Sequence, residues 1–497
     1  MNNDWEIKGF LEIQNNRLYV GGVSAVDLAE EYGTPLFVFS QGRIKRNIER
    51  LKRAGEFTPG KLKVCYAAKA NSNMAILRSV LDAGADLEVN SGGELWKALK
   101  IGFSPEQIIF NGTSKTVEEL EAAIGAGIYA IQVDSLYELQ LIETVARSLN
   151  KRANVSLRLV PEIETKTHSG LQTAMLTSKF GMMSDEVYTA FRQYGENESL
   201  NLCGIHLHLG SQTPDVEPFD AAITVLFEHL RGIYEETGCK ISHVNLGGGF
   251  PVNYLRDDSN AFQITEKRRE LFAADLEPAD VMRVVMEKAR NEAKASGVEH
   301  LWNDLTILLE PGRSVISDAG ICLTTVRNYK KRPLKQSVVS SQPSVFGSQT
   351  EKFPNPKSET RNPKSEIHND SWLLTDAGFN ILLSMETYKW YYHLISANRA
   401  NEAHDTPYKV AGPLCDGGDV YFDIEGENRL PDYRFLPKNV QPDEVLALLN
   451  CGAYSVAQMF QYNARFLPPI VLIKEDKTVE LIRKRDTFED LLTNDIW

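Results

Sequence analysis

The stretch VCYAAKANSNMAILRSVLDAGADLEV, residues 64–89, decides the fold class of this chain. Residues 64–68 are small and apolar, as in a short buried strand, and residues 85–89 form a second run of this kind. Between the two runs, apolar residues recur at helical spacing, and the segment ends at Gly84, a usual C-cap signal. A strand, a helix and a strand in this order predict a parallel sheet.

The same alternation continues along the chain as far as residue 315. The apolar runs are eight in number and cover residues 64–68, 85–89, 107–111, 129–134, 154–160, 202–209, 243–248 and 305–310. Eight strand–helix units predict a (β/α)8 TIM-like barrel. A doubly wound open sheet has the same local pattern and is the alternative fold. The absence of an early G-x-G-x-x-G motif, which is typical of dinucleotide-binding sheets of that kind, favours the barrel.

The last third of the chain has a different character. Helical periodicity fades after residue 320, and strand-like runs separated by turn residues follow. We predict a barrel domain over 45–318 and a C-terminal all-β barrel or sandwich domain over 319–497, which also takes in N-terminal strands from 1–44. Residues 336–370 are polar and carry the near-repeat NPKSET and NPKSEI, so we expect a disordered insertion between two hairpin strands.

The overall composition excludes some classes of function. A formal net charge of −13 argues against a nucleic-acid partner, because phosphates attract an excess of Lys and Arg. The six cysteines form no C-x-x-C pair, which predicts free thiols in a reducing compartment. There is no recognisable signal peptide and no apolar run of membrane-spanning length, so we expect a cytoplasmic protein without a membrane partner.

Polar residues stand at or just past the ends of the predicted strands. They are Lys69, Ser91, Asn111, Asp134, Arg158, His208, the glycines 247–249 and Glu310. In a barrel the carboxyl ends of the strands converge on one face, where active sites lie. The sequence therefore predicts that these scattered residues share one site.

Three stretches give this site a chemical character. Lys69 ends a buried strand, although lysine is among the residues least often buried without a partner. LGGGF, residues 246–250, offers consecutive glycines whose backbone amides could approach an anion. LEPGR, residues 309–313, places a carboxylate at the last strand. Each of these features also has a purely structural explanation when it is taken alone. Lys69 could extend from the barrel rim into solvent, the glycines could form a tight turn, and Glu310 could form a structural ion pair with Arg313.

Two histidines lie in HLHLGS, residues 206–211. Strand alternation directs both His206 and His208 into the barrel. Packed core histidines or a metal pair are the alternatives. A metal-dependent barrel hydrolase would need further ligands, for which Asp134 is the only obvious candidate.

A phosphate cradle, an amine and a carboxylate at one mouth suggest pyridoxal 5′-phosphate. We expect desolvation to lower the pKa of the Lys69 amine, so that it forms a Schiff base with an aldehyde. A carboxylate that faces the pyridine nitrogen keeps it protonated, which makes the ring an electron sink.

Eight motifs strengthen this interpretation. They are YAAKAN, NSGGEL, HLHLGSQ, LGGGFPV, EPGR, TDAGFN, GPLCDGGD and CGAYS with the following QYN. In this order and over nearly the whole chain, they resemble the fold-type III pyridoxal-phosphate-dependent decarboxylases, the ornithine/diaminopimelate/arginine decarboxylase group, and most of all its diaminopimelate decarboxylases. The resemblance implies decarboxylation of an amino acid, first of meso-diaminopimelate to L-lysine and CO2, in lysine biosynthesis.

The resemblance also implies a role for each matching residue. Lys69 would carry the cofactor as an internal aldimine, His208 would stack on its ring, Glu310 would pair with the pyridinium, and Arg158 would contact the ring hydroxyl. Gly248, Gly249 and the backbone after Glu310 would hold the phosphate, with Tyr454 donating to it from the β domain. Ser211, Gly312 and Arg313 are also implied as cofactor-binding residues.

For the substrate, the resemblance implies contacts from Arg313, Tyr388, Asp416 and Tyr454. Cys415 and Asp416 would come from the β domain of a second subunit, so the family pattern implies a homodimer with shared active sites. Protonation at the substrate Cα would involve Cys415 or Lys69.

The match departs from the family at the distal end of the substrate. Ser384 stands where the family has a substrate-binding arginine, Glu386 adds a negative charge nearby, and Asp416 replaces a glutamate. Losing a bidentate arginine–carboxylate pair costs about 1.5–3 kcal/mol. A decarboxylase of another amino acid, or of a carrier-tethered aminoacyl group, is therefore the close alternative. A pyridoxal-phosphate-binding module without catalysis is a remote one, because Lys69, Cys415 and Tyr454 are all present.

Overall fold

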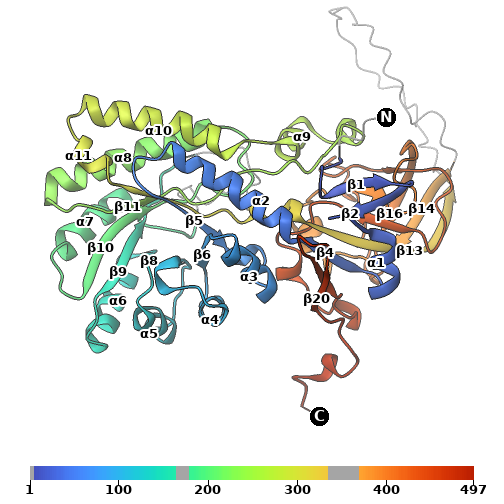
Figure 1. The fold of residues 1–497 in the computed structure, drawn as a ribbon, viewed down its shortest axis with the longest axis horizontal. Helices are drawn as coiled ribbons and strands as arrows, with labels where there is room; N and C mark the ends of the chain where they lie inside the picture. The colour runs from blue at the N-terminus through green and yellow to red at the C-terminus, as the bar shows by residue number, and fades with distance from the viewer. Residues whose placement is uncertain (1–4, 164–177, 334–368, 497) are drawn as a thin grey trace, which may run out of the picture.

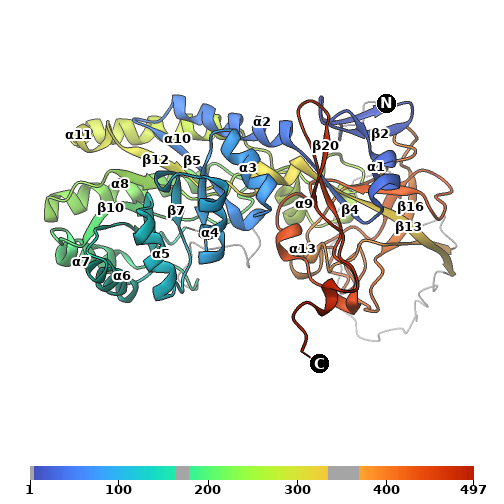
Figure 2. The same ribbon diagram turned by 60° about the horizontal axis from the view of Figure 1, so that its bottom comes forward.

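The computed structural model describes residues 5–163, 178–333 and 369–496. Figures 1 and 2 show two lobes side by side, a barrel and a mostly β domain. All eight predicted strands form, and they close into a parallel barrel in the order β10-β11-β12-β5-β6-β7-β8-β9, so the TIM-like barrel is confirmed over the open sheet. The barrel strands are β5 Leu62–Ala67, β6 Asp86–Val89, β7 Ile108–Phe110, β8 Ala130–Val133, β9 Ala153–Arg158, β10 Leu200–His206, β11 His243–Asn245 and β12 Thr306–Leu309.

The barrel helices begin and end at the signals that the sequence carries. Ser91 accepts a hydrogen bond from the backbone amide of Glu94 and caps α4, while Gly102 ends this helix in the left-handed conformation with φ +104°. The helices of this lobe are α2 Gln41–Lys52, α3 Met74–Asp82, α4 Gly92–Ile101, α5 Val117–Ala126, α6 Leu136–Ser148, α7 Ser184–Tyr194, α8 Glu217–Thr237, α9 Glu266–Ala273, α10 Pro278–Ala295, α11 Glu299–Trp302 and α12 Arg313–Ile316.

The β domain is built around one long strand, β13. Its sheet runs β17-β16-β14-β13-β4-β19-β20, and β18 pairs with both β13 and β15. The N-terminal strand β4 pairs with β13 and β19, which confirms that N-terminal strands join this domain. The elements are β4 Leu36–Ser40, β13 Gly320–Pro333, β14 Asn369–Thr375, α13 Leu383–Thr387, β15 Leu394–Ser396, β16 Thr406–Ala411, β17 Arg434–Leu436, β18 Val445–Leu448, β19 Ile470–Ile473 and β20 Val479–Arg483.

A small N-terminal sheet completes this lobe. It consists of β1 Leu11–Gln14, β2 Arg17–Val20 and β3 Val23–Ser24, followed by α1 Ala25–Tyr32. Leu11 and Leu18 share a buried cluster with Val38 of β4 and Val471 of β19. The predicted insertion 336–370 lies outside the described residues except for its last two, which belong to β14. The domain boundaries themselves stay predictions.

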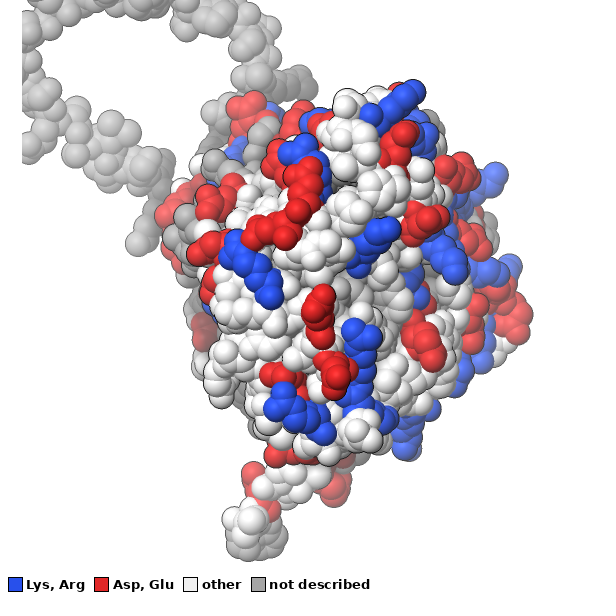
Figure 3. All heavy atoms as spheres, turned by 90° about the vertical axis from the view of Figure 1, so that its left-hand side faces the viewer, with Lys and Arg blue, Asp and Glu red and all other residues white. Residues whose placement is uncertain are grey.

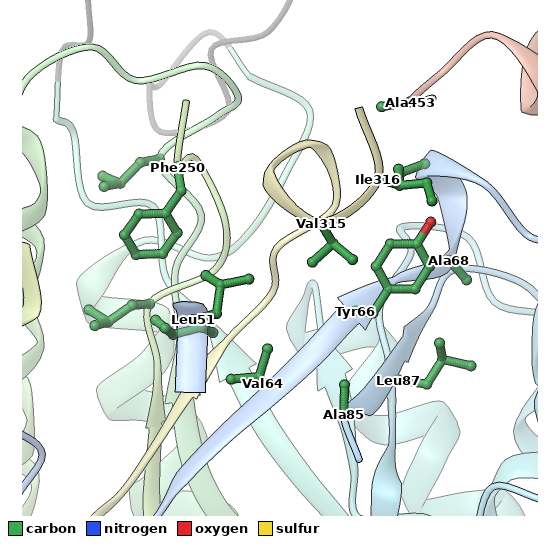
Figure 4. Close-up of a cluster of buried hydrophobic side chains, with 14 of the residues drawn as sticks. Leu51, Val64, Tyr66, Ala68, Ala85, Leu87, Phe250, Val315, Ile316 and Ala453 are labelled. Atoms are coloured by element: carbon green, nitrogen blue, oxygen red, sulfur yellow. The ribbon is translucent and has the colours of Figure 1, made fainter. Parts of the chain in front are cut away.

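The two lobes touch through backbone as well as side chains. A Cβ atom on Gly452 would lie 1.8 Å from the carbonyl oxygen of Ile316, so only glycine fits there. The amide of Tyr454, from the same segment, donates to the carbonyl of Ala70 at 2.9 Å. Figure 4 shows Ala453 close to Ile316 at the edge of an apolar cluster that extends down between β5 and β6. The barrel mouth therefore abuts the β domain.

The surface at the end of the barrel far from the β domain carries charges of both signs. Figure 3 shows Lys and Arg interspersed with Asp and Glu on this face, without the one-signed field that steers polyanions to a protein. Among the residues that the structure describes, no helix combines the length and the apolar character needed to cross a membrane.

Candidate active site

A cavity of about 340 Å³ opens at the carboxyl ends of the barrel strands, against the β domain. Eight of the predicted site residues line it: Lys69, Asn111, Arg158, His208, Ser211, Arg313, Tyr388 and Tyr454. A larger cavity of about 740 Å³ lies in the β domain beside Arg327, but it contains no predicted site residue. The structure thus gathers residues from distant parts of the chain into one place.

Lys69 lies in the single helical turn Ala68–Ala70 directly after β5. Its Nζ is 3.7 Å from Oε1 of Glu88, a buried residue of β6 that the sequence analysis missed. Burial lowers the pKa of the Lys69 amine, but Glu88, Tyr454 and Glu310 outweigh burial, and the pKa is raised. The expectation of a lowered pKa is therefore wrong for this structure, because it left out the acids around the amine.

Glu310 follows β12 and is buried in the barrel interior. Its Oε1 accepts hydrogen bonds from Nδ2 of Asn111 at 2.9 Å and from Nδ2 of Asn245 at 2.7 Å. Burial opposes ionisation of Glu310, but His206, His208 and Lys69 prevail and lower its pKa. Its other oxygen, Oε2, is buried without a hydrogen bond in the described part of the chain and lies 3.4 Å from Nε2 of His206.

The triple glycine stands beside this acid. Gly247 and Gly249 have positive φ angles, +66° and +110°. A Cβ on Gly248 would lie 2.5 Å from the carbonyl oxygen of Glu310, so the loop passes the acid at a distance that no side chain permits. Asn245 connects the two features, because its Oδ1 accepts a hydrogen bond from the Gly247 amide at 2.9 Å.

Arg313 is held rigidly on the opposite side of the cavity. Its Nε donates to Oγ of Ser211 at 3.0 Å and its Nη1 to Oη of Tyr254 at 2.8 Å. The guanidinium carbon lies 4.3 Å from the centre of the Trp390 ring. A Cβ on Gly312 would lie 3.2 Å from Oη of Tyr454, which leaves that hydroxyl next to bare backbone.

His208 and Arg158 complete the barrel side of the cavity. Burial, Lys69 and Arg158 together lower the pKa of His208 well below its usual value, so the imidazole is neutral. The amide of Gly210 donates to Nδ1 of His208 at 2.9 Å, which fixes the ring orientation. Arg158 lies over the ring of Phe180, with 4.2 Å between the guanidinium carbon and the ring centre.

The far end of the cavity belongs to the β domain. Ser384 of α13 lines it and donates to Oε1 of Gln458 at 3.4 Å. Glu386 does not line the cavity, and Lys389 neutralises it with an Nζ to Oε2 distance of 2.9 Å. The negative charge expected there is therefore balanced by a partner. Tyr388 does line the cavity.

Six residues predicted to contact the cofactor or the substrate are not among those that line this cavity: Glu310, Gly248, Gly249 and Gly312, which adjoin it, and Cys415 and Asp416. Cys415 and Asp416 are exposed on the β domain. The Cys415 amide donates to Oδ1 of Asn463 at 2.8 Å, and Oη of Tyr462 donates to Oδ2 of Asp416 at 3.2 Å. Within one chain they do not reach Lys69.

Two strand-end residues have structural roles instead. Ser91 caps α4, and Asp134 accepts a hydrogen bond from the Gly181 amide at 2.9 Å. The described residues contain no group of three or more His, Cys, Asp or Glu side chains that could hold a metal ion. A metal-dependent hydrolase site built on His206 and His208 would need a third ligand, and the described residues do not supply one beside them.

Sequence reasoning also missed several residues that shape the site. They are Glu88, Asn90, Phe180, Asn245, Trp390 and Gln458. For Glu88 a signal existed, since an acid stands inside the apolar run ADLEV of residues 85–89. The others carry no local signal, because their positions depend on how loops and domains pack.

The residues present fit pyridoxal 5′-phosphate. Among the described residues Oε2 of Glu310 makes no hydrogen bond, and although Nε2 of His206 lies 3.4 Å away, this buried acceptor suits a pyridinium N–H. The glycine loop offers backbone to a phosphate at a point where a side chain would collide. Lys69 supplies the amine that such a cofactor requires.

Comparison with known proteins agrees with this fit. The family model described as "Pyridoxal-dependent decarboxylase, pyridoxal binding domain" matches residues 41–317, and its "C-terminal sheet domain" matches residues 281–452. Diaminopimelate decarboxylase of Methanocaldococcus jannaschii is 34% identical over 492 residues, which cover 98% of this chain and 96% of that protein. Diaminopimelate decarboxylase of Aquifex aeolicus is 31% identical over 97% of each chain.

Solved structures give the same result. The crystal structure of the M. jannaschii diaminopimelate decarboxylase superimposes with a TM-score of 0.79 at 31% identity and covers 98% of each chain. A second structure of that enzyme, in complex with L-lysine, matches equally well. The diaminopimelate decarboxylase of Helicobacter pylori in complex with L-lysine has a TM-score of 0.73 at 26% identity and covers 94% of this chain and 98% of that one.

Asn245 provides a test of this site. We predict that Asn245→Ala weakens the binding of pyridoxal 5′-phosphate by about 10- to 100-fold, because one hydrogen bond to a charged group contributes about 1.5–3 kcal/mol. Absorbance titration with the cofactor measures the change. Asn201→Ala is the control, since Asn201 makes an exposed amide contact with Asn154 at 2.8 Å, outside the cavity. Equal affinities for the two variants would contradict the assignment.

Proposed function

The chain belongs to the pyridoxal-dependent decarboxylases, and on this premise we propose that it removes the α-carboxylate of an amino acid, converting meso-diaminopimelate to L-lysine and CO2. One observation carries the proposal: Lys69 and His208 line one cavity, and Glu310 and the glycine loop adjoin it, since a Cβ on Gly248 would lie 2.5 Å from the Glu310 carbonyl oxygen and 3.8 Å from Nε2 of His208. The similarity to diaminopimelate decarboxylases along nearly the whole chain supports the choice of substrate.

Each residue of the cavity has a proposed role toward the cofactor. Pyridoxal 5′-phosphate, when bound, supplies an electron sink for the electrons left by the departing carboxylate. Lys69 would attach it, Glu310 would pair with its ring nitrogen, neutral His208 would stack on its ring, and Arg158 would contact the ring hydroxyl. The phosphate is held by Ser211, Gly248, Gly249, Gly312, Arg313 and Tyr454.

The carboxylate of Glu310 contributes directly to the rate. Because its negative charge lies inside a water-excluded barrel, it stabilises positive charge on a nearby nitrogen more strongly than it would in water. Two amide donors fix its position in advance, so it does not have to reorganise during the reaction.

We propose a homodimer in which Cys415 and Asp416 enter the cavity of the other subunit. Both side chains are exposed, and Tyr462 links their loop to a group of aromatic rings with Phe379 and Phe460. Exposed aromatic residues are enriched at protein interfaces, which supports a second copy as the occupant of this surface. There Cys415 and Asp416 would contact substrate together with Arg313, Tyr388 and Tyr454.

Mixing two inactive variants tests the shared site. Lys69→Ala and Cys415→Ala should each have little activity, but after subunit exchange a mixture should recover about a quarter of wild-type activity, since half of the dimers then hold one intact site of two. The decarboxylation rate after mixing measures this recovery. A mixture no more active than its components would exclude a shared site.

The state of the cysteines supports a reducing cellular compartment for this protein. All six cysteines are free, and five are at least partly buried. Free thiols support the proposal that the protein works in a reducing compartment such as the cytoplasm.

A second candidate function has one specific observation in its favour. The cations of the cavity are Lys69, Arg158 and Arg313, all from the barrel, whereas α13 contributes the neutral Ser384. At the α13 end of the cavity a distal carboxylate would receive neutral hydrogen bonds from Ser384 and Gln458, and the cation that could still contact it is Arg313. This favours decarboxylation of another amino acid, or of a carrier-tethered aminoacyl group, as the alternative.

The variant Ser384→Arg separates the two substrates. If meso-diaminopimelate is the substrate, an added arginine should lower its KM by about tenfold or more, because a charged pair contributes about 1.5–3 kcal/mol. Turnover of lysine or ornithine should not improve. Ser384→Gln is the control, because it adds bulk without charge. A higher KM for meso-diaminopimelate in the arginine variant alone would favour the alternative.

The proposal as a whole is tested on Lys69. The purified protein should show visible absorbance from bound cofactor, and borohydride should fix that cofactor on the peptide that contains Lys69. CO2 release from a panel of meso-diaminopimelate, lysine, ornithine, arginine and glutamate identifies the substrate, and Lys69→Ala should abolish it. A folded, coloured enzyme that releases no CO2 would instead indicate a binding module, and a colourless protein that takes up no cofactor would end the proposal.

A further inference from the structure

Glu88 is a buried acid for which the proposed function so far has no use. It lies on β6, and its side chain is fully buried. Its Oε1 accepts a hydrogen bond from Nδ2 of Asn111 at 2.7 Å and lies 3.7 Å from Nζ of Lys69. Its Oε2 is buried without a hydrogen-bond partner in the described residues. A buried carboxylate with one unsatisfied oxygen is costly unless a cation compensates it.

Lys69 is the nearest cation to this acid. The other charged groups around Glu88 come from three elements: Glu310 after β12, Glu94 on α4 and Arg158 at the end of β9. Glu94 is occupied elsewhere, because its Oε2 accepts a hydrogen bond from the Asn90 amide at 2.8 Å. Arg158 is stacked on Phe180. The pairing with Lys69 is therefore the interaction that balances Glu88.

Glu88 and Glu310 form a coupled pair of acids. Nδ2 of Asn111 donates to both carboxylates, at 2.7 Å and 2.9 Å, so the two negative charges share one donor. Burial raises the pKa of Glu88 to about 7, Lys69 opposes the rise, and Glu310 adds to it. The same surroundings lower the pKa of Glu310. Two acids whose pKa values are pushed apart have different tasks: one stays charged, and the other exchanges a proton near neutral pH.

We propose that Glu88 is the counter-ion of Lys69, which holds positive charge on Nζ and takes the proton when that nitrogen becomes neutral. In this step an N–H bond of Nζ breaks and an O–H bond forms on the Glu88 carboxyl, so both charges disappear together. No further reactant is needed. Since an amine attacks only in its neutral form, the step prepares Lys69 to displace a product amine.

Glu88 acts through Lys69 and is in that sense a positioning residue. Its role rests on the proposed function, because it assumes that Nζ is the atom bonded to the cofactor. When Nζ carries the cofactor, a carboxylate within about 4–6 Å still favours the protonated nitrogen and raises its pKa by about 1–3 units. Removing the carboxylate must then lower the pH at which this nitrogen loses its proton.

A pH titration of the holoenzyme spectrum tests this inference. The visible band of the bound cofactor reports the protonated nitrogen, and its loss with rising pH gives a midpoint. Glu88→Gln keeps the shape and the amide contacts but removes the charge, so we expect its midpoint to fall by about 1–3 pH units relative to wild type. Glu88→Asp keeps the charge at a longer distance, and its midpoint should fall less than that of Glu88→Gln.

The matched control is a second buried lysine–glutamate pair in the same barrel. Glu138 lies 2.9 Å from Nζ of Lys115, away from the cavity, and Glu138→Gln should leave the midpoint unchanged. Unchanged midpoints in both Glu88 variants, or equal shifts in Glu88→Gln and Glu138→Gln, would overturn the role of Glu88. If Glu88→Gln does not fold, the shift in Glu88→Asp decides. A wild-type protein without a visible band would instead refute the proposed function, so the two failures are distinct.

Discussion

The site depends on keeping one charged carboxylate inside a protein. An ionised acid in the barrel interior is strongly unfavourable unless hydrogen bonds compensate it. Asn111 and Asn245 do so from two different strands, and both bind the same oxygen of Glu310. Because Asn245 also binds the amide of Gly247, the acid and the glycine loop form one rigid unit. The second oxygen remains available, which is the property that makes the site suitable for a cationic ring.

Much of this arrangement was predictable from the order of the strands. Once eight strands alternate with helices and close into a barrel, the carboxyl end of each lies at one mouth, so Lys69, Arg158 and His208 line one cavity and Glu310 lies near enough to interact with Lys69. Glu88 was missed for another reason. The run ADLEV predicts a buried strand in an open or a closed parallel sheet alike, and the strand pattern alone does not show that its Glu88 pairs with Lys69 after the neighbouring strand β5.

Other features of the site could not be read from the sequence, because they depend on partners far apart along the chain. The pKa of Lys69 follows from acids on β6 and after β12, and desolvation alone gives the wrong sign. The charge of Glu386 is cancelled by Lys389, a pairing that requires the turn after α13. The motif around Cys415 predicts a site residue by resemblance, but in this chain Cys415 is exposed and does not line the cavity beside Lys69.

The contact at Gly452 limits how this molecule can move. Gly452 leaves no room for a methyl group against the Ile316 carbonyl, and the Tyr454 amide is hydrogen-bonded to the Ala70 carbonyl. Rotation of the β domain away from the barrel would therefore break backbone contacts between the two lobes. Entry and exit of substrate must then rely on local motion of side chains and short segments around the mouth. Changes of specificity during evolution would accordingly arise in pieces such as α13, while the angle between the lobes stays constant.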